Sequence, residues 1–285
     1  MEPGSHSPAP ACRVVKHAMG ETCVPENPQR VVVLDNLDSV LALGIKPVGA
    51  AQGLEGDFHS NLKEQTAGIV KVGMGGQLSL ERILRLKPDL ILGLTWNGEE
   101  IYDQLSQIAP TVIAEANLHL NWQEWLKTYG EALGKSQVAQ KLLSDYNERI
   151  EAFRRQMGER LSQTQISVVN FWAGYVRIYM KESFSGQVLD DIGLPRPPAQ
   201  DKEKVSENLS LELIPQMEGD VIFLLLGGHQ ESKLAQFTTH PLWSQLKAVK
   251  QGRVYEVDST AWISNWSPVA ANLILDDLFK YLIKK

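Results

Sequence analysis

The sequence contains little of what marks a membrane-spanning or nucleic-acid-binding protein. Its longest apolar run, VIFLLL at 221–226, is much shorter than the roughly 20 residues that a membrane helix requires. Lysine and arginine total 28 against 34 acidic residues, and they form no basic stripe. Because nucleic acids select clustered positive charge, we expect no nucleic-acid partner. The 285 residues suffice for one large domain or two modest ones.

The motifs of common enzymes and metal sites are also missing. The sequence has no G-x-S-x-G, no G-x-x-x-x-G-K-[ST] and no H-E-x-x-H. Its six histidines lack paired ligand spacing, so we expect no zinc or manganese bound directly by the protein. VGMGGQLSLE is glycine-rich without the spacing of a dinucleotide site, and we interpret it as a flexible loop before a helix. We therefore expect no enzyme, no catalytic residue and no cofactor.

Cysteine is scarce, and its placement indicates a disulfide. Cys12 and Cys23 are the only two cysteines and are separated by eleven positions. The segment between them reads as a strand, a glycine-containing turn and a second strand. Two cysteines facing each other across a hairpin favour a disulfide and an oxidising compartment, and two free buried thiols are the alternative. We accordingly expect a periplasmic location, with or without a lipid anchor.

Residues 1–11 are left out of the fold prediction. MEPGSHSPAPA is typical of a tag or a trimmed leader. The charged and apolar regions of a secretory signal do not precede it, so we expect such a signal to be either absent or removed.

Strand-sized apolar runs alternate with helical patterns along most of the chain. NPQRVVVLD, IKPVGA, PDLILGL and PTVIAE read as strands, and helices are expected over SVLALG, LSLERILRLK and EEIYDQLSQIA. The alternation resumes with QISVVNF, SGQVLDDIG, GDVIFLLLG, GRVYEVD and a final helix that begins at PVAANL. This order predicts an α/β fold with mainly parallel sheets.

A helical region without strand signals separates the two alternating parts. From about Asn121 some forty residues show no strand pattern, and apolar residues then recur at 138, 142, 143, 146, 150, 153 and 157. We predict an N-terminal lobe over 12–122, a backbone helix over 123–163 and a C-terminal lobe over 164–285. We expect the ligand cleft to lie between the lobes.

The two lobes share a sequence pattern. Residues 78–94, LSLERILRLKPDLILGL, match residues 209–225, LSLELIPQMEGDVIFLL, at eight of seventeen positions without a gap. Any two helix–strand pairs share apolar positions, but the matches here include the tripeptide S-L-E and the aspartates Asp89 and Asp220. We therefore predict two lobes of similar plan.

Polar and aromatic residues follow the predicted strands at the edge where parallel sheets bind ligands. We expect ligand contacts from Asn36, Trp96, Trp172, Tyr175, Trp262 and Trp266. Asn97, Phe171 and His229 also follow these strands in the sequence. Exposed loops rarely carry large aromatics unless something covers them. The pattern favours an aromatic-rimmed site for a bulky organic ligand. Closure of a hinge between lobes is the alternative.

Arg177 lies in VRIY, shortly after this aromatic cluster. Its planar guanidinium could bind a carboxylate or hydroxamate oxygen of a ligand. A surface arginine on a strand edge is an equally common arrangement. His17 and His240 are expected to be hydrogen-bonded structural residues.

Several of these segments together resemble a known family. QRVVVLD, LGIKPVGA, SLERILRLKPDLILG, SGQVLDDIGLPRP, NLSLELIP and HPLWSQLKAVKQGRVYEVD resemble the helical-backbone class of bacterial solute-binding proteins of ABC importers. The resemblance runs from about Cys12 to the C-terminus and is closest to the ferric siderophore and iron(III) dicitrate group. It implies delivery of the captured solute to an inner-membrane ABC permease. Because clustered His, Asp and Glu ligands are lacking while Trp and Tyr are abundant, we expect a ferric chelate to bind as a whole, with the iron held by the chelator. We expect the protein to be a monomer.

The resemblance also implies two permease-docking carboxylates. The matching positions are Glu81 and Glu212, each in S-L-E at the start of a helix. A carboxylate there would also stabilise the helix dipole by about 0.3–1 kcal/mol. Pro215 departs from the pattern, because it must shorten or distort the second helix.

Two alternatives remain open from the sequence. A haem or cobalamin carrier of the same fold would, for haem, need an axial ligand such as Tyr102, Tyr175 or Met74. A chelatase-like enzyme with two α/β lobes would need a base or a metal-ligand set, and the histidine spacing offers none.

Overall fold

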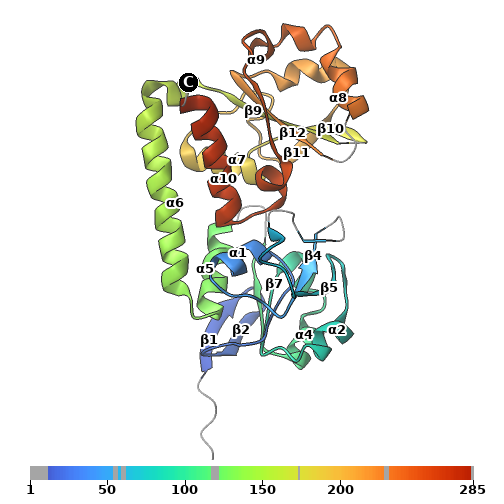
Figure 1. The fold of residues 1–285 in the computed structure, drawn as a ribbon, viewed down its shortest axis with the longest axis vertical. Helices are drawn as coiled ribbons and strands as arrows, with labels where there is room; N and C mark the ends of the chain where they lie inside the picture. The colour runs from blue at the N-terminus through green and yellow to red at the C-terminus, as the bar shows by residue number, and fades with distance from the viewer. Residues whose placement is uncertain are drawn as a thin grey trace, which may run out of the picture. The chain divides into compact units, whose positions relative to one another are not determined.

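The computed structural model describes residues 12–53, 57–58, 62–116, 122–172, 174–227 and 231–283. The chain divides into two compact units, Met1–Leu142 and Leu143–Lys285. Helix α6 (Ser136–Met157) runs from the first unit into the second and continues as the 3-10 helix η2 (Gly158–Gln163) (Figure 1). Among the described residues no helix is both long and apolar enough to cross a membrane. The α/β fold with two lobes and a long connecting helix confirms the predicted fold class.

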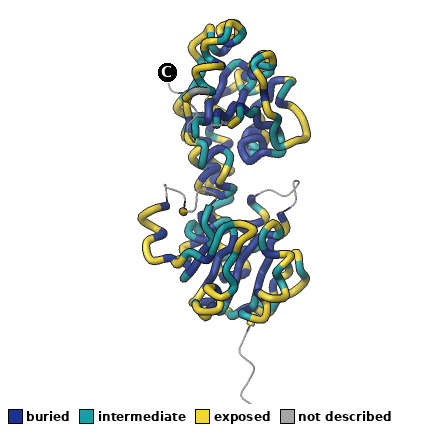
Figure 2. The backbone as a smooth tube through the Cα atoms, turned by 90° about the vertical axis from the view of Figure 1, so that its right-hand side faces the viewer, coloured by how far each residue is buried: buried dark blue, intermediate teal, exposed yellow. Residues whose placement is uncertain are grey.

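The first unit is built on a six-stranded sheet. Its order is β6-β5-β4-β3-β7-β8, and all neighbours are parallel except β5 and β6. The strands are β3 (Val31–Val33), β4 (Gly49–Gln52), β5 (Val70–Met74), β6 (Gln77–Leu78), β7 (Leu90–Leu94) and β8 (Thr111–Ala114). The helices are α1 (Leu37–Ala42), α2 (Leu80–Arg85), α3 (Thr95–Gly98), α4 (Tyr102–Ile108) and α5 (Trp122–Ala132). Strands β3, β7 and β8 are buried along their whole length, which agrees with their unbroken apolar sequences. Figure 2 shows the buried interior of the unit in dark blue.

One sequence expectation is wrong in this unit. The glycine-rich segment VGMGGQL was interpreted as a flexible loop, but it forms strands β5 and β6 with a tight turn at Gly75 and Gly76. Gly73 and Gly76 have positive φ values of 124° and 76°. A Cβ on Gly73 would lie 2.3 Å from the carbonyl oxygen of Gln77. The glycines therefore permit the turn and the close approach of its two strands.

An N-terminal hairpin packs against this unit. Strands β1 (Cys12–His17) and β2 (Gly20–Pro25) pair antiparallel, and a disulfide joins Cys12 to Cys23 with a Cα–Cα distance of 5.5 Å. The backbone N–H of Ala18 donates to Ile113, and Arg13 donates to the carbonyls of Glu26 and Glu131. The predicted disulfide is therefore confirmed. It closes a loop short enough to limit its entropic stabilisation to about 3 kcal/mol.

The second unit contains a five-stranded sheet of mixed direction. Its order is β11-β10-β9-β12-β13. Strand β12 pairs in parallel with β9 and β13, whereas β10 pairs antiparallel with both β9 and β11. The strands are β9 (Ile166–Trp172), β10 (Tyr175–Tyr179), β11 (Ser206–Leu209), β12 (Val221–Leu226) and β13 (Val254–Asp258). The helices are α7 (Phe184–Ile192), η3 (Leu211–Met217), α8 (Glu231–Thr238), η4 (Trp243–Gln245), α9 (Lys247–Lys250), η5 (Thr260–Ser264), α10 (Pro268–Leu278) and η6 (Phe279–Ile283).

Helix α6 packs through one apolar stripe. Its buried residues Tyr146, Ile150, Phe153 and Met157 recur at helical spacing, and the ring of Phe153 meets Phe279 edge-on with centroids 5.2 Å apart. Val138, which the sequence pattern placed on this stripe, is instead exposed. The hydroxyl of Tyr146 donates to Asp191 over 3.1 Å, so the stripe also carries polar contacts.

The repeated sequence pattern corresponds to a repeated structural role. Asp89 precedes β7 and accepts the backbone N–H groups of Gln29 and Arg30, at 2.7 and 2.8 Å, just before β3. Asp220 precedes β12 and accepts the N–H of Gln165 over 2.8 Å, just before β9. Each aspartate thus fixes the start of the parallel strand beside its own. The predicted similarity of the lobes is therefore visible in their hydrogen bonds.

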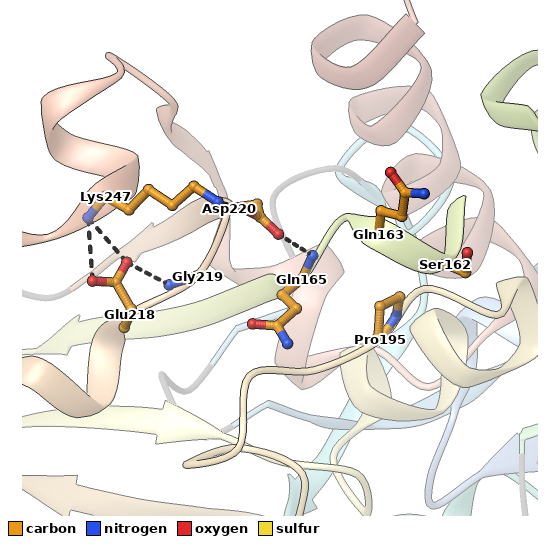
Figure 3. Close-up of a pocket in the computed structure, with 8 residues that line it drawn as sticks. All are labelled: Ser162, Gln163, Gln165, Pro195, Glu218, Gly219, Asp220 and Lys247. Atoms are coloured by element: carbon orange, nitrogen blue, oxygen red, sulfur yellow. Dashed lines mark hydrogen bonds and ion pairs between the residues drawn. The ribbon is translucent and has the colours of Figure 1, made fainter. Parts of the chain in front are cut away.

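A polar pocket lies at the starts of β9 and β12, the end of the second sheet opposite to Trp172 (Figure 3). Its carboxylates are already engaged by the protein. Glu218 accepts the backbone N–H groups of Gly219 and Lys247, each over 3.0 Å, and Asp220 accepts from Gln165 and from the ammonium of Lys247. These two carboxylates therefore hold the start of α9 and the start of β9 in place.

Candidate functional site

The first unit presents a polar edge after β3 and β7. Asn36 follows β3 in the left-handed conformation, with φ 58° and ψ 46°, and its side-chain oxygen accepts the hydroxyl of Ser39 over 2.8 Å. Trp96 lies on the one-turn helix α3 after β7, and 55% of it is exposed. Its ring meets that of Trp125 edge-on, with centroids 5.4 Å apart. Both residues therefore occupy the edge that the sequence predicted.

Asp35 is a residue of this edge that the sequence analysis missed. Its Oδ2 accepts the backbone N–H of Leu94 over 3.2 Å, and its Oδ1 accepts the amide of Asn97 over 2.6 Å. Burial raises the pKa of Asp35 to about 7, and these two hydrogen bonds only partly oppose the effect. Its position as the last residue of VVVLD was the available signal, because a polar side chain there must lie where a parallel strand ends.

The raised pKa of Asp35 makes a testable contribution to stability. The folded protein holds a proton that the unfolded chain has already lost between pH 3.8 and about 7, so this group lowers stability as pH rises through that window. The full shift corresponds to at most about 4 kcal/mol. In urea denaturation, wild type should therefore lose stability relative to Asp35→Asn between pH 5 and pH 8.

Asp57 provides a matched control for that measurement. It is exposed, and the Lys71 ammonium, 3.0 Å away, lowers its pKa, so it stays ionised throughout this pH range. Asp57→Asn should therefore leave the pH profile of wild type unchanged. A constant difference between wild type and Asp35→Asn from pH 5 to 8 would contradict the assignment.

The second unit gathers aromatic residues where β9 ends and β10 begins. Trp172 and Tyr175 are opposite each other in the antiparallel register. A Cβ on Gly227, which follows β12, would lie only 2.3 Å from the Trp172 ring. The glycine therefore leaves the space that the indole occupies. Both aromatics are half-buried, which fits the expected rim.

Arg177 projects from β10 beside these rings. Its guanidinium carbon lies 4.2 Å from the centroid of the Tyr175 ring, and its Nε donates to the side-chain oxygen of Asn208 over 2.9 Å. Stacking on an aromatic face and one hydrogen bond restrict the orientation of the guanidinium before any ligand arrives. A half-buried, oriented guanidinium is suited to a carboxylate or another oxyanion.

The two remaining tryptophans occupy different surroundings. Trp266 is half-buried and its ring lies 5.6 Å from that of Phe184. Trp262 is 0% exposed, its ring lies 4.6 Å from Phe223, and its indole N–H donates to Asp277 over 2.9 Å. The η5 turn directs Trp262 into the core, so this tryptophan packs inside the second unit, and its expected contact with a ligand is wrong. Phe171 is also fully buried, and His229 lies outside the described residues.

The two S-L-E glutamates are exposed in their respective units. Glu81 is in the first turn of α2, capped by Ser79, and forms an ion pair with Arg85 over 2.6 Å. Glu212 is in the first turn of η3, and a hydrogen bond with the Ser210 hydroxyl lowers its pKa. As expected, Pro215 distorts the second helix, which is a 3-10 helix and not an α-helix.

Direct metal binding has no support in the described part of the chain. No group of three or more His, Cys, Asp or Glu side chains there is arranged to hold a metal ion. Tyr102, a candidate haem ligand, instead packs against His17 with centroids 5.8 Å apart, and its hydroxyl lies 3.3 Å from that of Thr22. The contacts with His17 and Thr22 show that Tyr102 packs against the β1–β2 hairpin.

Comparison with known proteins gives relatives over nearly the whole chain. A Bacillus subtilis protein named probable siderophore-binding lipoprotein YfiY is 40% identical over 95% of this chain and 88% of its own length. The achromobactin-binding periplasmic protein of Dickeya dadantii is 30% identical over 88% of this chain and 85% of its own. The crystal structure of Staphylococcus aureus SirA complexed with staphyloferrin B superposes with a TM-score of 0.84 at 32% identity, covering 95% and 98% of the two chains.

A family model described as periplasmic binding protein matches residues 31–261. Such proteins bind solutes and are not enzymes, which confirms the expectation from the sequence and removes the chelatase alternative. With this match and the relatives above, the chain belongs to the periplasmic binding protein family.

Proposed function

We propose that this protein captures the ferric complex of an oxygen-rich, anionic chelator outside the cytoplasm and hands it to an ABC permease. The observation that carries the proposal is the oriented guanidinium of Arg177 beside Trp172 and Tyr175. The names of the relatives support it, since they specify siderophores, achromobactin and staphyloferrin B. The Cys12–Cys23 disulfide supports an oxidising compartment such as the periplasm. A lipid anchor is part of the proposal because YfiY is named a lipoprotein.

The chelator, and not the protein, would hold the iron. The described residues offer no cluster of ligating side chains, whereas they offer aromatic faces and a guanidinium. Such groups recognise the periphery of a complex: the rings cover its apolar parts, and the guanidinium pairs with peripheral carboxylate oxygens. We propose Asn36, Trp96, Trp172, Tyr175, Arg177 and Trp266 as the contact residues.

For delivery, we propose that Glu81 and Glu212 dock on arginines of the permease. Both are exposed, and each lies in the first turn of the helix that begins at the leucine of S-L-E in its own unit. Exposed carboxylates contribute little to the stability of the folded chain, so these two are available for a partner. Opposite charges across a transient interface steer association and set its register.

Tryptophan fluorescence tests the ligand class. Ferric citrate and ferric staphyloferrin B should quench the emission in a saturable manner, because Trp96 and Trp172 lie at the proposed contact edges. Haemin and cobalamin should have no saturable effect at the same concentrations. Saturable binding of haemin or cobalamin together with no response to any ferric chelate would contradict the proposal.

A further inference from the structure

A chain of hydrogen bonds joins three segments that follow different strands of the first sheet. The backbone N–H of Gly76, in the turn after β5, donates to the side-chain oxygen of Asn97 over 3.1 Å. The amide nitrogen of Asn97, on α3 after β7, donates to Oδ1 of Asp35 over 2.6 Å. Asp35 follows β3, which lies between β4 and β7 in the sheet. One asparagine therefore links the turn to the carboxylate.

The contact leaves almost no room for rearrangement. A Cβ on Gly75 would lie 3.2 Å from the side-chain oxygen of Asn97, so the turn backbone lies directly against the asparagine. A Cβ on Gly98, the last residue of α3, would lie 2.4 Å from the side chain of Ile113 on β8. Helix α3 is thus in close contact with both the β5–β6 turn and Ile113.

Helix α3 needs such contacts to hold its shape. It has four residues, and a helix of one turn has almost no stability of its own. Three hydrogen bonds hold it in place. Asp35 accepts the side-chain amide of Asn97 and the backbone N–H of Leu94. The Thr95 hydroxyl accepts the backbone N–H of Ala116 over 3.0 Å. The exposed Trp96 lies between Thr95 and Asn97, so these bonds fix the backbone that carries its indole, and the edge-on contact with Trp125 orients the ring.

We propose that Asn97 and Asp35 are positioning residues, which fix Trp96 and the exposed Gly75–Gly76 turn in one arrangement for the ligand. The inference rests on the proposed function, because it takes this edge of the first unit as part of the ligand site. A preorganised edge spares the complex the entropy cost of ordering a turn and an indole when it binds. Asn97 has both its donor and its acceptor engaged in this linkage, which suits an asparagine and neither a leucine nor an aspartate.

The test compares Asn97→Ala and Asp35→Asn with wild type, using ferric citrate and ferric staphyloferrin B as probes. Asn97→Ala should weaken binding about tenfold or more. Because it also leaves Asp35 without one of its two hydrogen bonds, it should lower the melting temperature by a few degrees. Its Gly76 amide should exchange with solvent at least about tenfold faster, and the Trp96 emission should shift. Asp35→Asn keeps the shape but sets a second amide against Asn97, so it should show the same changes more weakly.

Gln77→Ala is the matched control, because Gln77 is exposed in the same segment. It should change neither affinity nor exchange at Gly76. Faster Gly76 exchange in Asn97→Ala without loss of affinity would overturn the inference and leave the proposed function intact. Failure of wild type to bind either probe would overturn the proposed function and the inference with it.

Discussion

Replacing both Glu81 and Glu212 by alanine should reduce uptake of the ferric complex at least about tenfold, with each single variant retaining more transport than the double. The glutamates are exposed and belong to different units, so each single variant removes one of the two charged contacts that we propose with the permease. Uptake of radioactive iron would be measured in cells that lack the chromosomal copy and carry each variant. The loss relative to wild type should be smaller at high ionic strength, since salt screens in the wild type the same attraction that the variants lack.

Ligand affinity and melting temperature should stay nearly unchanged in the same variants. The Glu81–Arg85 pair is an exposed i,i+4 ion pair, which contributes about 0.3–0.5 kcal/mol. Glu64→Ala and Glu159→Ala are matched controls, one exposed glutamate in each unit outside the S-L-E positions. Normal transport by the double variant, or a loss of ligand affinity in either single variant, would show that the docking assignment is wrong.

Arg177→Ala should weaken binding of ferric citrate and ferric staphyloferrin B by about 10- to 100-fold. A charge-assisted hydrogen bond contributes about 1.5–3 kcal/mol, and its loss accounts for a factor of that size. Arg177→Lys should lose less, because it keeps the charge, but it cannot reproduce the planar fork that stacks on Tyr175. Fluorescence or calorimetric titration at two salt concentrations measures both effects.

Comparing anionic with neutral ferric complexes shows whether Arg177 recognises the charge of the ligand or only packs within the protein. A neutral ferric hydroxamate complex should be weakened less than the anionic complexes. Arg155→Ala is the control, because Arg155 is an exposed arginine of α6 in the same unit, and it should bind like wild type. Equal losses for anionic and neutral complexes would make Arg177 a packing residue.

The elements that the sequence predicted well are those with unbroken apolar strands or clear helical spacing. Strands such as β7 and β12 are continuous apolar runs, and both lie inside their sheets. The β5–β6 hairpin escaped prediction because three glycines interrupt its pattern, and its geometry depends on positive φ values that composition does not reveal. Strand β11 is likewise set by its pairing with β10, from which α7 and a loop separate it in the chain.

In the proposed ligand site, the sequence likewise predicted the positions of residues better than the directions of their side chains. The order of strands placed Asn36, Trp96 and Trp172 at the correct edge, because the residue after a parallel strand must lie there. The direction of a side chain depends on the local turn, and for this reason Trp262 faces Phe223 and Asp277 in the core. Asp35 was missed because its importance lies in a bond to Asn97, 62 residues away in sequence.

Capture of the ferric complex as a whole is tested most directly by equilibrium dialysis with a doubly labelled complex, in which iron and chelator carry different isotopes. If the protein captures a ferric complex as a whole, both labels should be retained in the proportion of the free complex, and ferric iron without chelator should not be retained. Protein stripped of bound small molecules beforehand is the starting material. Retention of iron without its chelator would show that protein side chains bind the metal, and would contradict the account.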